Sequence, residues 1–430
     1  MNPALLSLAF AVAVIASLLV KTWLATRQIR HVARHREAVP SAFAHKIPLA
    51  AHQKAADYTI AKARFAISAE TFGTAVLVGW TFLGGLDALN RWVWQAIGPL
   101  WHGLAYELAL VGGFSLVNAA LDLPLDLWRT FRLEARFGFN RITPRLFVLD
   151  LLKSTVLSIV LGAPILALVL WLMHAAGALW WIWAWAAASG FLVLVLFVQP
   201  VLIAPLFNRF EPLPDGPVVE RARALMERCG FHARGFFVKD GSLRSAHGNA
   251  EFTGFGATKR VVFYDTLLKQ LDADEIEAIL AHELGHFKHH DVPKRIVLML
   301  AIYLGGFALL GWLAQQLGFY AGLNVMINPL APNDALALLL FMMALPPFLF
   351  FLTPALSAMS RHAEFRADAY ARSNANAADL VRALLKLYED NASTLTPDPL
   401  YVRFYYSHPP ASARIDALGV STAALGGAVA

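Results

Sequence analysis

Long apolar runs, separated by shorter polar and basic stretches, dominate the chain. The runs can cross about 30 Å of membrane hydrocarbon as helices. The second is the shortest, with Glu70 and Asp87 at its ends. Pro346 and Pro347 interrupt the last and predict a kink there. The pattern predicts an α-helical integral membrane protein with about seven transmembrane helices, at residues 3–20, 72–86, 104–121, 154–173, 178–206, 296–317 and 335–359.

The distribution of lysine and arginine predicts how these spans are oriented. The stretch 24–65 carries eight such residues and the stretch 123–153 carries six, whereas 318–334 carries none. Basic loops stay in the cytoplasm, so seven spans with the N-terminus outside fit the pattern. A signal peptide has basic residues before its apolar run, and the first run here has none. We therefore expect a retained membrane anchor. The polar segment 208–295 and the chain after residue 360 then share the cytoplasmic side.

Composition supports a membrane protein. Hydrophobic residues make up 58% of the 430 residues and charged residues only 15%, against about a quarter charged in an ordinary globular domain. The net charge is +6, and the basic residues behind it cluster in loops between apolar runs. We therefore expect no nucleic-acid partner. Cys229 stands alone, which excludes an intrachain disulfide framework and a cysteine-rich metal site.

The stretch "IEAILAHELGHFKHHD", residues 276–291, carries the clearest chemistry. His282 and His286 lie four positions apart on one face of a predicted helix. Two imidazoles at this spacing can share a tetrahedral zinc ion, and Glu283 beside them is the general base of an H-E-x-x-H metalloprotease. The alternative is a solvated, histidine-rich helix end. His289 and His290 lack such a glutamate, and we expect them to face solvent or the lipid interface.

Further residues predict where the helix with His282 and His286 begins and which residue is the third zinc ligand. Asp272 and Glu275 fit a capping box that begins the helix. The residues at 289 and 292 exclude the extended motif with a third histidine. The segment "SRHAEFRADAYA", residues 360–371, instead offers Glu364 as third ligand and Asp368 to hydrogen-bond a ligand imidazole. The alternative is surface pairing of these two carboxylates with neighbouring arginines, Arg361 or Arg366.

Four longer motifs accompany these residues. They are "LPLDLWRTFRLEARFGFNRITP" (123–144), "APLFNRFEPLPDG" (204–216), "RSAHGNAEFTGFGATKRVVFYDTLL" (244–268) and "YYSHPPASARI" (405–415). With "HELGH" and "EFRAD", they make residues 39–418 resemble the type I CaaX prenyl protease family of integral-membrane zinc metalloproteases. The resemblance implies a gluzincin-type metalloendopeptidase with one zinc ion per chain. It also implies seven membrane helices that form a water-filled chamber, with the zinc site at its cytoplasmic end.

The resemblance also assigns roles to single residues. It makes His408 and Arg414 catalytic residues that bind substrate or the developing oxyanion, for which fixed donors are needed. It makes Asn249 and Ala250 part of an edge strand that pairs with the substrate backbone. The residues alone favour a helix cap at "HPP", a structural salt bridge at Arg414 and an ordinary hairpin. Carried onto this sequence, the family's zinc site is formed by the ligands His282, His286 and Glu364 with the catalytic base Glu283.

Together these observations predict the organisation of the chain. We expect an N-terminal membrane domain with five transmembrane helices at 1–206. A mainly α zincin-type protease domain with a short β edge or hairpin and two further transmembrane helices follows at 207–420, and 421–430 is a flexible tail. The expected partners are membrane lipid and a peptide or protein substrate, lipid-modified in the CaaX case. The expected location is the bacterial inner membrane or the endoplasmic reticulum.

Two other functions fit the same residues. The enzyme could degrade misfolded membrane proteins with no CaaX requirement. A more remote alternative is a non-catalytic transporter or scaffold, in which Glu70 and Glu107 near membrane depth mark an ion path.

Overall fold

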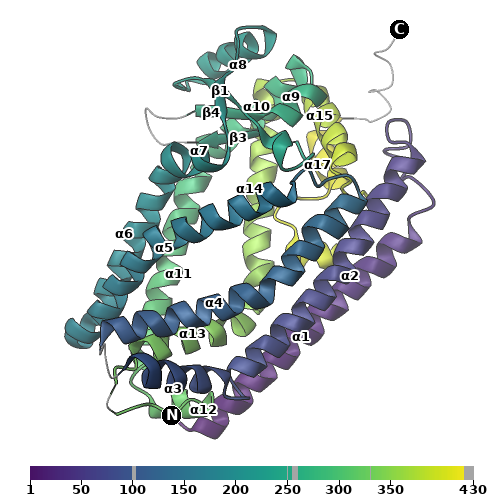
Figure 1. The fold of residues 1–430 in the computed structure, drawn as a ribbon. Coiled ribbons are helices and arrows are strands. Elements are labelled where there is room, and N and C mark those ends of the chain that lie inside the picture. Colours follow the sequence, from purple (N-terminus) through teal and green to yellow (C-terminus); the bar gives the residue numbers. More distant parts are fainter. Residues whose placement is uncertain (99–102, 249, 254–259, 330, 421–430) are drawn as a thin grey trace.

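A computed structural model describes residues 1–98, 103–248, 250–253, 260–329 and 331–420 of the chain (Figure 1). Asn249 and the tail 421–430 lie outside the described residues. Long helices form the lower part of the molecule in Figure 1, and the small sheet with shorter helices lies above them.

Within the described ranges, six helical segments are long and apolar enough to cross a membrane. A seventh is obtained if α2 and α3, bent by 53° at a short break, count as one span. The prediction of about seven transmembrane helices is therefore confirmed. The spans are built from α1 (Pro3–Arg34), α2 (Leu49–Trp80) with α3 (Gly85–Ile97), α4 (Leu104–Trp128), α5 (Pro144–Ala175), α6 (Trp180–Val198), α11 (Asp291–Leu313) and α13 (Asp334–Leu349).

Several helices extend well beyond the apolar runs. The bounds predicted for the second span were wrong, because α2 already begins at Leu49 and ends at Trp80. Lys54 and Lys62, counted above as loop residues, therefore lie on this helix. A helix needs apolar side chains only where it meets hydrocarbon, so it can continue with basic residues into the interface. Hydrophobicity thus detected the apolar part of this helix and missed its length.

The kink predicted at Pro346 and Pro347 stays a prediction, because α13 continues past both prolines to Leu349. Both prolines lie in α13, and a single 3₁₀ turn at Phe350–Leu352 follows before the chain continues as α14 (Thr353–Asn374). Proline removes a backbone hydrogen-bond donor and crowds the preceding turn, which accounts for the change of helix type. α14 leads toward the sheet end of the molecule (Figure 1).

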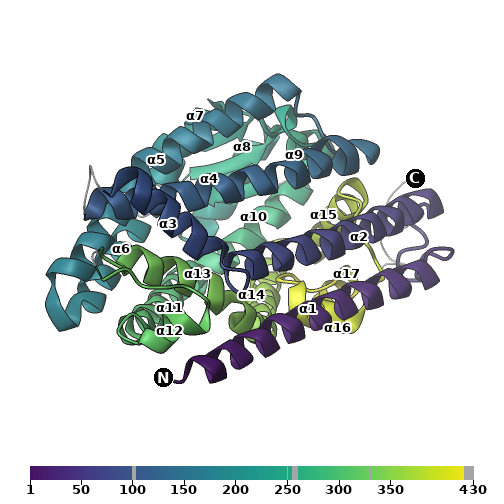
Figure 2. The same ribbon diagram turned by 60° about the horizontal axis from the view of Figure 1, so that its bottom comes forward.

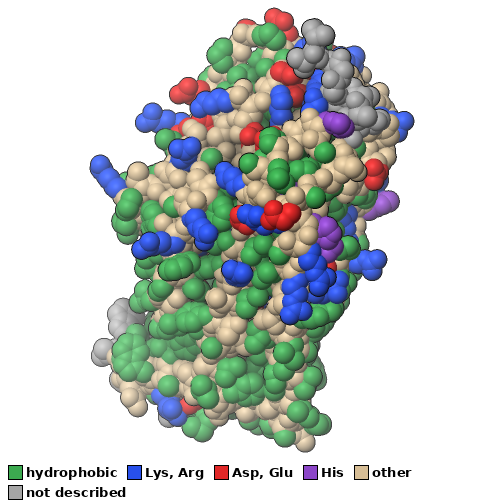
Figure 3. All heavy atoms as spheres, turned by 90° about the vertical axis from the view of Figure 1, so that its right-hand side faces the viewer, with side chains coloured by type: hydrophobic (Ala, Val, Ile, Leu, Met, Phe, Trp, Pro, Cys, Tyr) green, Lys and Arg blue, Asp and Glu red, His purple; other side chains and the backbone are tan. Residues whose placement is uncertain are grey.

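One face of the molecule shows the expected separation of apolar and basic side chains. Figure 3 shows hydrophobic side chains covering its lower part and lysine and arginine gathered above them. On α1, Leu5, Leu8, Val12, Ile15 and Leu19 are all exposed. An exposed apolar surface of this kind suits contact with lipid chains, as in a multi-pass membrane protein.

A four-stranded sheet lies at the other end, in the order β1-β2-β4-β3. The chain reaches it through η3 (Gln199–Ile203) and α7 (Ala204–Phe207). β3 pairs antiparallel with β4 as a hairpin and forms an edge of the sheet. The strands are β1 (Phe210–Pro212), β2 (Phe236–Lys239), β3 (Ala250–Thr253) and β4 (Arg260–Tyr264).

Helix α10 (Ala273–Lys288) forms the centre of this end of the molecule. Its predicted capping box is confirmed: Glu275 N donates to Asp272 Oδ1 at 2.9 Å, and Asp272 N donates to Glu275 Oε2 at 3.0 Å. Apolar side chains on α10 are buried against the sheet and the neighbouring helices. Those helices are α8 (Pro217–Arg228), α9 (Asp265–Gln270), α14, α15 (Ala377–Asp390) and α17 (Ala411–Leu418).

Gly285 allows α10 and α14 to cross closely (Figure 2). A Cβ atom at this position would lie 2.8 Å from Ala367 Cα, which is too close for any side chain. The two helices carry the residues discussed next. The remaining helical elements are η1 (Arg129–Glu134), η2 (Gly177–Leu179), η4 (Gly241–Leu243), α12 (Leu317–Gly322) and α16 (Pro399–Tyr405).

Candidate metal centre

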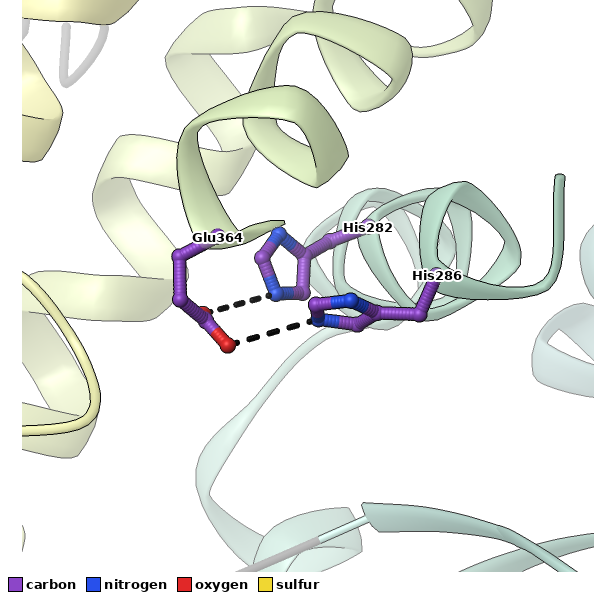
Figure 4. A group of neighbouring side chains, drawn as sticks. All are labelled: His282, His286 and Glu364. Carbon is purple, nitrogen blue, oxygen red and sulfur yellow. Dashed lines mark ion pairs between the residues drawn. The ribbon is translucent and has the colours of Figure 1, made fainter. Parts of the chain in front are cut away.

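Three predicted ligands meet where α10 crosses α14. His282 and His286 extend from consecutive turns of α10 toward Glu364 of α14 (Figure 4). His282 Nε2 lies 3.4 Å from Glu364 Oε2, and His286 Nε2 lies 3.4 Å from Glu364 Oε1. One ligand atom from each residue lies within 4.8 Å of the others. Two imidazole nitrogens and a carboxylate oxygen are a donor set that zinc prefers.

A carboxylate holds the opposite nitrogen of each imidazole. His282 Nδ1 lies 2.9 Å from Asp368 Oδ1, as the spacing of Glu364 and Asp368 led us to expect. His286 Nδ1 lies 2.9 Å from Asp291 Oδ2. Such partners fix the tautomer that leaves Nε2 free to bind a metal.

Asp291 was missed by the sequence analysis. It lies at the start of α11, and Arg366 Nη2 donates a hydrogen bond to its Oδ1 at 2.6 Å. His290 precedes it in a left-handed conformation with φ 54°. This turn between α10 and α11 brings Asp291 back toward His286. No motif in the sequence predicts the turn. The only available signal was a carboxylate a few residues beyond the histidines.

The alternatives for Glu364 and Asp368 are wrong, because neither is a surface residue. Both carboxylates are buried, with 2% and 1% of their surface exposed. Arg361 instead donates to backbone carbonyl oxygens, including that of Tyr406 at 2.8 Å. Arg366 pairs with Asp291. The two carboxylates therefore face the inside of the helix crossing, together with the histidines.

Arg414 and His408 reach the centre from α17 and from the turn before it. Arg414 is buried and pairs with Asp368, donating from Nε at 2.8 Å. His408 Nδ1 lies 2.8 Å from Glu364 Oε2, yet 63% of the His408 side chain is exposed. α17 begins after Pro410 with no side-chain cap, so His408 is not a helix cap.

The remaining predicted residues lie around this cluster. Glu283 follows His282 on α10 and is half-buried. Ala250 begins the edge strand β3. Among the histidines not selected as ligands, His290 and His362 are exposed and His289 is half-buried. None of these three is part of the ligand cluster.

The protein groups at the centre favour a bound cation. Burial lowers the pKa of His282, but the adjacent carboxylates of Asp368 and Glu364 raise it more, to about 9. Burial also opposes protonation of His286, whose pKa is nevertheless raised by Glu364 and Asp291. Metals bind the neutral imidazole and take the place of the proton. Glu364 Oε2 is buried and accepts no well-aligned hydrogen bond from the described residues, as expected of an atom that coordinates a metal.

A cavity of about 690 Å³ adjoins the cluster. His408 and Arg414 contribute to its wall, together with residues of α2, α15 and α16. We call it the tyrosine-lined cavity, after Tyr388, Tyr401, Tyr405 and Tyr406. The cluster of His282, His286 and Glu364 thus borders a space that a substrate segment can occupy.

Comparison with known proteins gives a consistent result. Residues 28–209 match the family model described as "CAAX prenyl protease N-terminal, five membrane helices", and residues 212–421 match "Peptidase family M48". CAAX prenyl protease 1 of Saccharomyces cerevisiae is 34% identical over 387 residues, which cover 85% of each chain. A homologue from Oryza sativa is 36% identical over 339 residues, 76% of this chain and 78% of the relative.

The fold is also shared with a solved structure. The crystal structure of S. mikatae Ste24p superposes with a TM-score of 0.91 at 29% identity, and the match covers 96% of this chain and 99% of that one. The remote alternative of a transporter or scaffold is therefore set aside. Because the Saccharomyces cerevisiae and Oryza sativa relatives are 34% and 36% identical over more than two thirds of the chain, and both family models agree with them, the chain belongs to the CAAX prenyl protease 1 family of M48 peptidases and is a multi-pass integral-membrane metalloprotease.

Proposed function

We propose that the protein is a zinc-dependent endopeptidase that cleaves CaaX-type proteins near their C-terminus. The observation that carries the proposal is the cluster of His282, His286 and Glu364, whose two imidazoles are each held by a buried carboxylate. The names of the relatives support the substrate class. The surroundings support a lipid-modified substrate, since α14, which carries Glu364, is the end of a helical segment long and apolar enough to cross a membrane.

In this proposal the three ligands hold one zinc ion. When bound, zinc acts as a Lewis acid that lowers the pKa of water and polarises a carbonyl group. Glu283 is the general base, which takes a proton from the attacking water and passes it to the leaving amine. His408, exposed beside Glu364, supplies a hydrogen bond to the developing oxyanion.

The buried charges around the histidines act as positioning groups in this proposal. Asp368 orients His282, and Arg414 holds Asp368 in place. Asp291 orients His286, and Arg366 holds Asp291. A buried carboxylate is stable only when such partners compensate its charge. Each arginine therefore supports one ligand through a carboxylate, and Arg414 Nη2 also lies 3.2 Å from His282 Nδ1. Arg414 then acts on the reaction through His282.

The substrate backbone is proposed to pair with β3, which forms an edge of the sheet. A strand edge offers unpaired N–H and C=O groups to an extended peptide. Ala250 lies at the start of this strand, and Asn249 precedes it. This arrangement holds the peptide chain by its backbone and leaves side-chain selection to the adjoining cavity.

The orientation in the membrane is also a proposal. We place the N-terminus outside and the metal centre and C-terminus in the cytoplasm, in a bacterial inner membrane or the endoplasmic reticulum. The support is the lysine and arginine distribution: basic residues concentrate between residues 24–65 and 123–153 and are absent from 318–334. Membrane lipid would surround the exposed apolar helices. The division of the chain near residue 206 likewise stays a prediction.

Glu283→Gln tests the proposed general base. The variant should keep zinc while peptide cleavage falls roughly 10²- to 10⁴-fold, because only the proton-transfer group is lost. Zinc content and cleavage rate are measured on the same purified sample. Glu277→Gln is the matched control, since Glu277 lies on α10 but pairs with Arg221 and Arg228. A Glu283→Gln enzyme that cleaves at the wild-type rate contradicts this role.

Asp291→Asn tests the positioning of His286. Loss of the carboxylate should weaken zinc binding about 10- to 100-fold, the usual effect of removing a partner behind a ligand. Competition with a fluorescent zinc chelator measures the affinity. Asp274→Asn, at the exposed start of α10, should bind zinc like the wild type. Unchanged affinity in Asp291→Asn refutes the positioning role.

Paired peptides test the substrate class. A peptide with a farnesylated CaaX cysteine should be cleaved with a higher kcat/KM than the same peptide without the lipid. The lipid is expected to act mainly by lowering KM, because burial of its apolar surface favours binding. The rates are compared in the same detergent or in liposomes. Equal rates for the two peptides favour the alternative, a quality-control protease with no CaaX requirement.

A further inference from the structure

The tyrosine-lined cavity has basic but no acidic side chains in its described lining. The basic groups are those of Lys62, His408 and Arg414. Arg414 is engaged with Asp368, and His408 lies against Glu364. Lys62 differs from both, because it makes no ion pair with a described carboxylate. The cavity therefore offers one cation without an ion pair to a described carboxylate, in a lining of tyrosine, aliphatic and neutral polar side chains.

Lys62 has a defined place in the wall. It lies on α2 with its side chain exposed, and its Nζ lies 4.5 Å from the centre of the Tyr58 ring. The Tyr58 hydroxyl donates to Glu134 at 2.8 Å. The Glu134 carboxylate thus accepts its hydrogen bond from Tyr58 and makes no salt bridge with Lys62. The ring holds the ammonium group by a cation–π contact, which leaves its N–H donors available to a ligand.

A cation in this setting calls for an anionic ligand. Lys62 is exposed to the space of the cavity, where a bound carboxylate accepts a charge-assisted hydrogen bond from its ammonium group. A peptide cut near its C-terminus brings such a group into the site. In a CaaX sequence the terminal carboxylate belongs to the third residue after the cysteine. In an extended chain it therefore lies about 10 Å from the cysteine Cα.

We propose that Lys62 binds the C-terminal carboxylate of the substrate and so selects chain ends over internal segments. The inference rests on the proposed function, because it assumes cleavage near a C-terminus. Leu384, Leu387 and the tyrosines then contact the aliphatic residues before the carboxylate. In this account the metal centre selects no sequence, and Lys62 sets the distance between the cleaved bond and the chain end.

The test compares two peptides that differ only in a free terminal carboxylate or a carboxamide. The wild-type enzyme should cleave the acid with a kcat/KM about 10- to 100-fold above that of the amide, the range of a charge-assisted hydrogen bond. In Lys62→Met this ratio should fall toward one, through a higher KM for the acid. Lys62→Arg should retain most of the preference, because it keeps the positive charge.

The matched control is Lys54→Met, on the same helix but outside the cavity wall. It should keep the wild-type ratio. A wild-type ratio near one, or an unchanged ratio in Lys62→Met, overturns the assignment. The ratio is measured on any peptide that the enzyme cleaves near its end, so it is independent of lipid modification. Failure of the farnesyl comparison therefore contradicts the proposed function, whereas failure of the acid-to-amide comparison contradicts the role of Lys62.

Discussion

The close crossing of α10 and α14 is the constraint on which the metal centre depends. Gly285 faces Ala367 at a distance that excludes any side chain on α10. The histidines on either side of this contact then reach a carboxylate from the second helix. Two membrane-spanning segments separate these helices in sequence. The membrane part therefore assembles the site, since its spans return α14 to the end of the molecule where α10 lies.

The centre also depends on how its charges are compensated. Asp368 and Asp291 each hold one imidazole, and Arg414 and Arg366 each hold one of these carboxylates. Isolated charges at this depth would be costly, but together they form two chains of alternating sign. Each chain ends at a ligand nitrogen. The nitrogens that face Glu364 are thereby oriented by groups from α11, α14 and α17, so three separate elements must pack correctly.

Local patterns predicted much of this arrangement. The spacing of His282, His286 and Glu283 requires only a helix, and Glu364 with Asp368 requires only a second helix on the same side. Asp291 could not be predicted, because its position depends on the left-handed turn at His290. The start of α2 was missed for another reason: its basic residues carry no hydropathy signal, although they continue the helix. Contacts made through turns and cavities, such as that of Lys62 with Tyr58, likewise depend on tertiary packing alone.

The central claim is that one zinc ion is bound by two imidazoles and one carboxylate. Zinc K-edge X-ray absorption on the purified protein tests it most directly. The account predicts one zinc per chain, with nitrogen and oxygen neighbours at about 2.0–2.2 Å and the multiple scattering of two imidazole rings. A sulfur neighbour at about 2.3 Å, the distance of a cysteine thiolate such as that of Cys229, the single cysteine of the chain, contradicts it. So does a protein that binds no zinc while it cleaves peptides.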